Sequence, residues 1–382
     1  MKSKIYSLAI IAFCVFNLQQ VNAQVDAVQL LRAGKDDGNK LMNSYLGPLF
    51  DGFGASLNNG WYNTAKPHGI AGFDVSFTYS LPSVSAAQKT FDANSLNLNS
   101  DPKLPRMVLL GSNGSSVSTL FGSSTDSTQV RIIQRLNQSD PLSDSIITSF
   151  KFPPGLGTNF GIGLPTLQAA IGVGFGTEVM LRITPKLTAG DFKAGMFGFG
   201  IKHGVSQWIW KDKKDKPPVD ISAIFGYTSL FASLAFNDSY LKPDSAYPFY
   251  GALPDNDYKE SQKMSFTGSG FMIGAVVSKK LSLLTAYLGG NYNTSKINLK
   301  MEGQYPVSFI ETNIGPNLGK KMIINISDPI NIESKLNYMR FTAGVRIKLA
   351  ILTINCEYNL AKVSTINFGL GINLQSVYPF KL

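Results

Sequence analysis

The amino-acid sequence predicts an all-β fold: an antiparallel transmembrane β-barrel of about 12–14 strands with an N-terminal helical plug-like segment. Three observations carry this prediction: strands that alternate between apolar and polar residues, an export signal at the start of the chain, and tryptophans beside a charged turn. Charged residues make up only 16% of the 382 residues, while 11% are aromatic and 36 are glycine. This composition favours an all-β barrel over an α/β enzyme.

The clearest alternation lies in the C-terminal residues 338–375. Its first segment puts Met339, Phe341 and Val345 on one face, and Arg340 and Arg346 on the other. The segments 352–360 and 365–375 repeat this pattern, which indicates strands with one apolar and one polar face. Such lengths fit the roughly 9–11 tilted residues that cross a bilayer. The alternative is a soluble barrel or sandwich, in which the same apolar faces would turn inward.

Residues 1–23 have the three parts of a secretory signal peptide. Lys2 and Lys4 form the basic start, residues 5–16 are apolar, and 21–23 form a small-residue cleavage site. Cys14 would leave with the signal, so no intrachain disulfide is expected. The whole chain has a net charge of +10, and export makes anionic lipid headgroups or an anionic solute better candidate partners than nucleic acid. The alternative is that the charge only keeps the loops soluble.

The rest of the chain divides into a helical plug-like segment, 24–56, and a barrel, 57–382. Apolar residues at roughly helical spacing predict a helix broken at 34–38, which would either enter the lumen or cap one end of the barrel. Residues 82–163 and 237–263 are rich in turn formers and predict long extracellular loops, the first with two strands inside it.

Between these loops the alternation predicts further strands, and the sequence predicts where two of them end. Pro185 is expected to stop one strand. A later strand is expected to run on to Trp208 and Trp210, immediately before the charged turn 211–218. Tryptophans in that position are typical of the aromatic girdle of a membrane barrel.

The candidate lumen or plug contacts fall into two groups. One group lies in the turn-rich stretch 58–68, which is interpreted either as a plug or ligand contact or as a plain entry into the first strand. The other occupies the polar phase of the predicted strands, where charges would either select anions or pair across the lumen. The candidates are Trp61, Tyr62, Lys66, His68, Asp74, Arg182, Lys202, Arg340, Arg346 and Glu357.

No catalytic residue, metal site or cofactor is expected. The sequence contains no H-E-x-x-H, G-x-S-x-G or P-loop motif and no paired-cysteine metal spacing. His203, with Ser206 and Asp220, leaves a barrel lipid hydrolase as one alternative. The phase of its strand, however, points His203 outward, so the protein is not expected to be an enzyme.

Residues 58–68 with Gly72-Phe73-Asp74, together with 176–178 and 198–203, are similar to an uncharacterised family of exported barrel-like proteins of the Bacteroidota. The resemblance covers most of the chain after the signal and implies no activity, since that family has none assigned. A looser similarity is to FadL-type transporters of hydrophobic compounds, which share a signal, a helical N-terminal segment and a barrel. The short N-terminal motif of those transporters has no residue-by-residue match here. The chain also departs from the usual terminal aromatic residue, since Phe380 is followed by two more residues.

The expected function is passage of a small hydrophobic or amphipathic solute across the outer membrane of a Gram-negative bacterium. One alternative is a closed barrel with a structural or ligand-binding role at the surface, carried by the loops 82–163 and 237–263. The other is the lipid hydrolase. The expected partners are outer-membrane lipid and lipopolysaccharide, the solute, and the barrel-insertion machinery that would recognise Phe380 during assembly.

Overall fold

A computed structural model describes residues 34–99, 106–110, 114–126, 128–135, 144–210, 218–236, 261–310 and 321–375. The predicted signal peptide, the first part of the helical segment, the charged turn 211–217, most of the loop 237–263 and Phe380 lie outside these residues. No helix in the described ranges is both long enough and apolar enough to cross a membrane.

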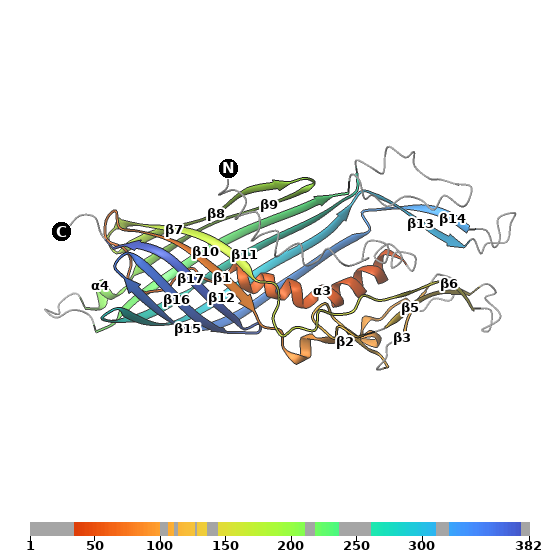
Figure 1. The fold of residues 1–382 in the computed structure, drawn as a ribbon, viewed down its shortest axis with the longest axis horizontal. Helices are drawn as coiled ribbons and strands as arrows, with labels where there is room; N and C mark the ends of the chain where they lie inside the picture. Colours follow the sequence, from red (N-terminus) through yellow and green to blue (C-terminus); the bar gives the residue numbers. More distant parts are fainter. Residues whose placement is uncertain are drawn as a thin grey trace.

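Antiparallel strands form a closed barrel, which is the fold class that the alternation predicts (Figure 1). Strand β1 closes it by pairing with both β7 and β17. The order around the barrel is β1 (Phe73–Pro82), β17 (Thr365–Leu374), β16 (Leu352–Leu360), β15 (Ile330–Leu349), β12 (Leu284–Glu302), β11 (Lys263–Leu281), β10 (Asp220–Ala235), β9 (Phe192–Gly204), β8 (Thr177–Ala189) and β7 (Leu164–Gly174).

The described part of the chain puts ten strands in the barrel wall, so the prediction of 12–14 is wrong. The strands counted in excess belong to separate small sheets. Within 83–163 there are two, β2 (Thr90–Asp92) with β4 (Ser116–Ser118), and β3 (Arg106–Leu110) with β5 (Gln129–Arg135) and β6 (Asp144–Lys151). The third pairs β13 (Gln304–Ile310) with β14 (Lys321–Ser327). These strands pair with one another, so their backbone groups are satisfied without entering the wall.

We call the described residues of 83–163 the loop-end domain. It contains β2 to β6 and two short 3-10 helices, η2 (Ala86–Gln88) and η3 (Ala93–Leu96). Five strands therefore lie where two were expected. Figure 1 shows this domain alongside helix α3 (Lys35–Leu57), beyond one end of the barrel. The predicted break at 34–38 is wrong for the described residues, because one helix runs from Lys35 through Gly38 and Pro48 to Leu57.

The two ends of the barrel differ in their connections. At the short-turn end, β7–β8, β11–β12 and β15–β16 meet in tight turns, with positive φ at Phe175, Ser282 and Ala350. At the long-loop end, the segments 83–163, 236–262 and 303–329 connect β1 to β7, β10 to β11 and β12 to β15. Strand β17 runs toward the short-turn end, since Leu374 pairs with Phe73 at the start of β1.

Two local predictions on β8 and β9 are wrong. β8 continues past Pro185, because a register shift between Thr184 and Leu187 accommodates the residue that cannot donate to the ladder. β9 ends at Gly204 instead of running to Trp208, and the short helix α4 (Ser206–Ile209) follows. The Ser206 hydroxyl accepts from the Ile221 amide at 2.5 Å and donates to the Ile221 carbonyl at 3.3 Å, which fixes this turn.

The outward side chains form two zones on the long strands β11, β12 and β15. Toward the short-turn end they are apolar, as on β15 from Met339 to Leu349, and exposed apolar side chains continue around the other strands. We call this zone the apolar belt. Toward the long-loop end they become polar, and we call that zone the polar extension. It consists of Lys263, Ser265, Thr267, Lys296, Asn298, Lys300, Glu302, Asn331, Glu333 and Lys335.

The inward side chains of the same strands change in the opposite sense. Behind the apolar belt they are polar, such as Asn291, Asn293 and Arg340. Behind the polar extension they are apolar and pack against α3, where Phe50 and Leu57 join the cluster that contains Ile297, Leu299, Met301, Ile330 and Ile332. The strands keep their alternation throughout, so inside and outside exchange polarity where the two zones meet.

Candidate lumen site

Residues 35–72, which we call the lumen segment, run through the barrel from the long-loop end to the short-turn end. At the long-loop end the Asn39 side chain donates to the Pro329 carbonyl at 3.0 Å and accepts from the Asn331 amide at 2.9 Å. At the short-turn end the Gly69 amide donates to the Gln375 carbonyl at 3.0 Å. The C-terminal half of α3 packs on inward side chains of β12 and β15. The role of this segment as a plug stays a prediction.

Two arginines of the wall hold the C-terminal end of α3. Arg182 donates to the carbonyl oxygens of Leu57 at 3.2 Å and Asn59 at 2.5 Å. Arg340 donates to the Asn58 carbonyl at 2.9 Å and to the Asn59 side-chain oxygen. The last carbonyls of a helix have no partner within it and carry partial negative charge, so two buried guanidinium groups suit this position.

Trp61 and Tyr62 anchor the chain just after the helix. The guanidinium of Arg182 lies 3.7 Å from the centre of the Trp61 ring, a cation–π contact. The ring fits against the wall at Gly200 and Gly226, where an added Cβ would come within 2.7 and 2.5 Å of ring atoms. Tyr62 accepts through its hydroxyl from the Asn291 side chain at 2.8 Å.

A buried charge cluster holds the lumen segment near the short-turn end. Glu178 accepts from Lys202 at 3.0 Å, from the His68 amide at 3.0 Å, and from His68 Nδ1 at 2.5 Å. Lys202 also donates to the Thr64 carbonyl at 3.4 Å. All three charged or ionisable side chains are nearly inaccessible to solvent, so each depends on the others for its partners.

Asn373 links this cluster to the first strand of the barrel. Its amide nitrogen lies 2.6 Å from His68 Nε2 and donates to Asp74 at 3.1 Å. With the proton on Nδ1, the His68 ring therefore donates to Glu178 and accepts from Asn373. Asp74 is thus connected to His68 of the lumen segment through Asn373. Asn373 was not among the residues that the sequence patterns singled out.

Three other candidates have different surroundings. Glu357 accepts from Tyr287 at 2.9 Å and from Asn367 at 2.5 Å, so it joins wall strands to one another. Arg346 is a buried wall residue whose Nε and Nη2 have no hydrogen-bond partner among the described residues. Lys66 belongs to the lumen segment, but its side chain is exposed.

Small polar residues of the wall and a helix-end asparagine are contacts that sequence reasoning missed. The Ala65 amide donates to Ser278 at 2.9 Å, and the Ala65 carbonyl accepts from Ser222. Thr64 and Ser278 place their hydroxyl oxygens 3.3 Å apart. Asn58 donates to the Thr294 carbonyl at 3.1 Å. The signal that could have found the serines is their inward phase on otherwise alternating strands.

His203 does not sit in a hydrolase-like arrangement with its expected partners. Its Nδ1 lies 2.8 Å from the Thr177 hydroxyl and its Nε2 lies 3.2 Å from the Gln207 amide. Ser206 is bonded to the backbone of Ile221 instead. Among the described residues, no group of three or more His, Cys, Asp or Glu side chains could hold a metal ion.

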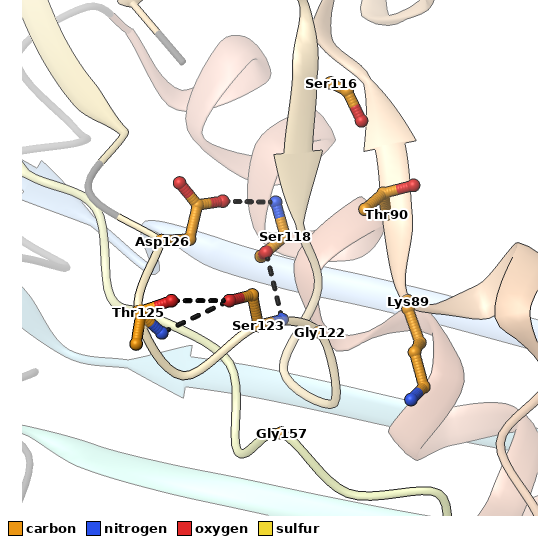
Figure 2. A pocket seen from close by; sticks show the side chains of 9 residues that line it. All are labelled: Lys89, Thr90, Ser116, Ser118, Gly122, Ser123, Thr125, Asp126 and Gly157. Atoms are coloured by element: carbon orange, nitrogen blue, oxygen red, sulfur yellow. Dashed lines mark hydrogen bonds between the residues drawn. The ribbon is translucent and has the colours of Figure 1, made fainter. Parts of the chain in front are cut away.

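Two cavities of about 430 Å³ each lie outside the lumen, and polar side chains line both. One is in the loop-end domain (Figure 2) and includes Lys89, Ser123 and Asp126. Partial burial alone would raise the pKa of the Asp126 carboxyl, but hydrogen bonds from Ser118 and Thr128 outweigh it and hold that pKa below its usual value. The other cavity lies on the polar extension.

The comparisons with known proteins find a family and several barrel structures. The sequence matches, over residues 1–374, a family described as a family of unknown function, DUF6588. No curated protein matches the chain. The expected membership of an uncharacterised family is confirmed, whereas the Bacteroidota origin and the FadL-type similarity stay predictions.

Three of the similar solved structures illustrate the range. The translocator domain of the autotransporter NalP from Neisseria meningitidis is 9% identical, with 87% of this chain and 95% of that chain covered and a TM-score of 0.26. Ail, the attachment invasion locus protein of Yersinia pestis, is 8% identical, with 80% and 98% covered and a TM-score of 0.21. The outer membrane transporter YddB from Escherichia coli is 10% identical, with 77% and 41% covered and a TM-score of 0.26.

Proposed function

We propose that this chain, which belongs to the DUF6588 family of unknown function, is an outer-membrane β-barrel that its own lumen segment keeps closed and that presents a binding domain at the cell surface. The observation that carries the proposal is the engagement of the buried wall charges by the lumen segment. Arg182, Arg340 and the Glu178–Lys202 pair all bind it directly.

The apolar belt supports a membrane location. On β15 the outward apolar face runs from Met339 to Leu349. At the usual rise per residue and a tilt near 40°, this face would span about 25 Å, the height of the outward apolar band of outer-membrane barrels. An exposed apolar surface that surrounds a whole barrel is costly in water and favourable in lipid.

The unequal ends of the barrel support an orientation. Outer-membrane barrels have short periplasmic turns and longer extracellular loops. The long-loop end, with the loop-end domain and the start of α3, would therefore face outward. The lumen segment would enter from the cell surface and end in the periplasm, where β1 begins.

The loop-end domain supports the binding role. Its cavity is lined by hydroxyl groups, one ammonium group and one carboxylate (Figure 2). Such a lining suits a small polar ligand. Tyr45 of α3 packs edge-on against Phe152 of this domain at 5.0 Å between ring centres, and burial raises the pKa of its hydroxyl to about 12. The domain is thus anchored on the helix that fills the barrel.

Passage of a small solute is the second candidate. One observation favours it: the wall residues Arg346, Thr353 and Asn367 bury polar atoms that find no partner in the described part of the chain. A rearranged or withdrawn lumen segment would let water reach them. The hydrophobic or amphipathic character of the solute stays a prediction, and so does lipopolysaccharide as a partner.

A disulfide lock distinguishes the two candidates. Thr64→Cys with Ser278→Cys, in a Cys356→Ser background, would join two side chains whose hydroxyl oxygens now lie 3.3 Å apart. We expect the crosslink to form on oxidation. If the barrel is permanently closed, the protein conducts no ions in planar bilayers, whether the disulfide is formed or reduced. If the barrel passes a solute, the protein conducts ions only after the disulfide is reduced. Steady conductance of an oxidised, crosslinked barrel would contradict both.

Membrane location and orientation need separate readouts. We expect the membrane-extracted protein to change gel mobility on boiling, as folded barrels do. Lys35→Cys should react with a membrane-impermeant maleimide on intact cells, while Lys279→Cys at the short-turn end should react only after the outer membrane is opened. A soluble protein without a heat-dependent shift would reject the membrane proposal, and reversed labelling would reject the orientation alone.

A further inference from the structure

The cavity on the polar extension is formed by three neighbouring strands directly beyond the apolar belt. The strand registers place Ser265 opposite Lys300, and Lys300 opposite Asn331, so outward side chains of β11, β12 and β15 form one surface. The cavity has a volume of about 430 Å³. Its lining consists of Ser265, Thr267, Lys296, Asn298, Lys300, Glu302, Asn331 and Glu333.

Lysines outnumber glutamates in and beside this cavity. Glu333 accepts from both Lys296 at 2.7 Å and Lys335 at 2.8 Å, and Glu302 accepts from Lys263 at 3.3 Å. Lys300 adds a further positive charge near Glu302. Four lysines thus share two glutamates, which leaves net positive charge on the surface. Exposed ion pairs of this kind contribute little to stability, and the positive charge left over is available to an anionic ligand.

The position of the cavity matches the headgroup layer of a membrane. On β12 the last large outward apolar side chain is Tyr292, and Lys296 follows four residues later. On β15 Lys335 precedes Met339 by the same spacing. Four tilted strand residues span about 10 Å, which carries the lysines from the edge of the hydrocarbon into the headgroup region. A tyrosine at this boundary is typical of membrane barrels.

We propose that this cavity binds the phosphorylated sugar headgroup of an outer-leaflet glycolipid, lipopolysaccharide, an assignment that rests on the proposed membrane location and orientation. Lys296, Lys300 and Lys335 supply ammonium groups for its phosphates, since ammonium groups bind phosphate as point charges. The hydroxyl and amide side chains of the lining suit sugar hydroxyls. Glu333 pairs with Lys296 at 2.7 Å and with Lys335 at 2.8 Å, which keeps these two lysines beside each other.

The test compares lysines at the two ends of the apolar belt. The triple variant Lys296→Ala, Lys300→Ala, Lys335→Ala removes the proposed contacts. The control, Lys279→Ala with Lys280→Ala, removes exposed lysines of β11 at the opposite end. Full-length proteins extracted in detergent are titrated with purified lipopolysaccharide, and binding is followed by the temperature of the gel-mobility shift. At about 1 kcal/mol for each basic residue near a membrane surface, the triple variant should bind on the order of 100-fold more weakly, and the control should bind as the wild type does.

Three results would overturn the inference. The first is that the triple variant binds lipopolysaccharide as the wild type does. The second is that the control variant loses as much binding as the triple variant. The third is that the wild type binds phosphatidylglycerol vesicles as tightly as lipopolysaccharide. The same gels separate this inference from the proposed function. A heat-dependent shift in every variant, without loss of lipopolysaccharide binding, rejects the cavity alone. A wild type that shows no shift and is absent from the outer-membrane fraction rejects the membrane location on which the cavity depends.

Discussion

The apolar belt and the polar extension are parts of the same strands, yet they are opposite in polarity. In the belt, β12 and β15 are apolar outside and polar inside. In the extension, they are polar outside and apolar inside, where Ile332 and Leu299 pack against α3. Alternation therefore determines which residues share a face of a strand. The surroundings of each face determine which face must be apolar. The proposed lipid and a polar lumen segment fit the belt, and polar surroundings and an apolar helix fit the extension.

The largest expected effect is on the polar interior behind the belt. Glu178→Ala leaves Lys202 and His68 buried without their partner, and breaking a buried pair in this way costs about 3–5 kcal/mol. Urea unfolding of the barrel in lipid vesicles measures the loss. The matched control is Glu302→Ala, which breaks the exposed pair with Lys263 and should cost less than about 1 kcal/mol. If both variants lost the same free energy of unfolding, water would have to reach the Glu178 cluster, contrary to its burial in the structure.

A second substitution tests the apolar interior behind the extension. Ile332→Ala removes a buried side chain from the cluster that holds α3, and such truncations cost about 2–5 kcal/mol. Loss of protection of α3 from proteolysis at the long-loop end is the measurement. Asn331→Ala, one residue away on the outward face, should leave protection unchanged. A strong effect of Asn331→Ala with none of Ile332→Ala would mean that the faces are assigned the wrong way round.

A charge on the outward face distinguishes the two zones directly. Val345→Lys puts a charge in the middle of the apolar belt, where a lysine facing lipid costs about 2–4 kcal/mol. Asn337 lies on the same face of β15, between Lys335 of the polar extension and Met339 of the apolar belt. Asn337→Lys should cost about 0–1 kcal/mol. Folding yield and urea unfolding in vesicles measure both. Similar costs in vesicles would remove the case for lipid around the belt.

The smallest expected effect is in the loop-end domain and depends on pH. Asp126→Asn keeps one acceptor oxygen where two now bind Ser118 and Thr128, and should cost about 1 kcal/mol at pH 7. Because the folded-state pKa of Asp126 is lowered, its stabilising effect is present above the usual pKa and is lost as pH falls through the lowered value. Proteolysis of the wild-type domain should therefore accelerate in acid. In the variant that acid sensitivity should be smaller, and an identical pH profile would contradict the assignment.

The sequence by itself determined the all-β class and the sidedness of the strands. Residues such as Met339, Phe341, Arg340 and Arg346 fall on the faces that alternation predicts, because a strand sends successive side chains to opposite sides. The inward phase of Arg182, Lys202 and Glu357 was likewise readable. Their roles were not, since Arg182 and Lys202 bind the lumen segment while Glu357 bonds to the wall.

Only the tertiary structure decided the strand count, the path of the lumen segment and the pairing of Glu178 with His68 and Lys202. Local patterns cannot tell a strand of the wall from one in a separate sheet, because the difference lies in the partner strand: β5 pairs with β3 and β6, and β14 pairs with β13. Likewise, His68 and Glu178 are 110 positions apart, and nothing local to either fixes that contact. Closure of the barrel around α3 brings them together, and it also decides which inward residues meet an apolar helix and which meet polar backbone.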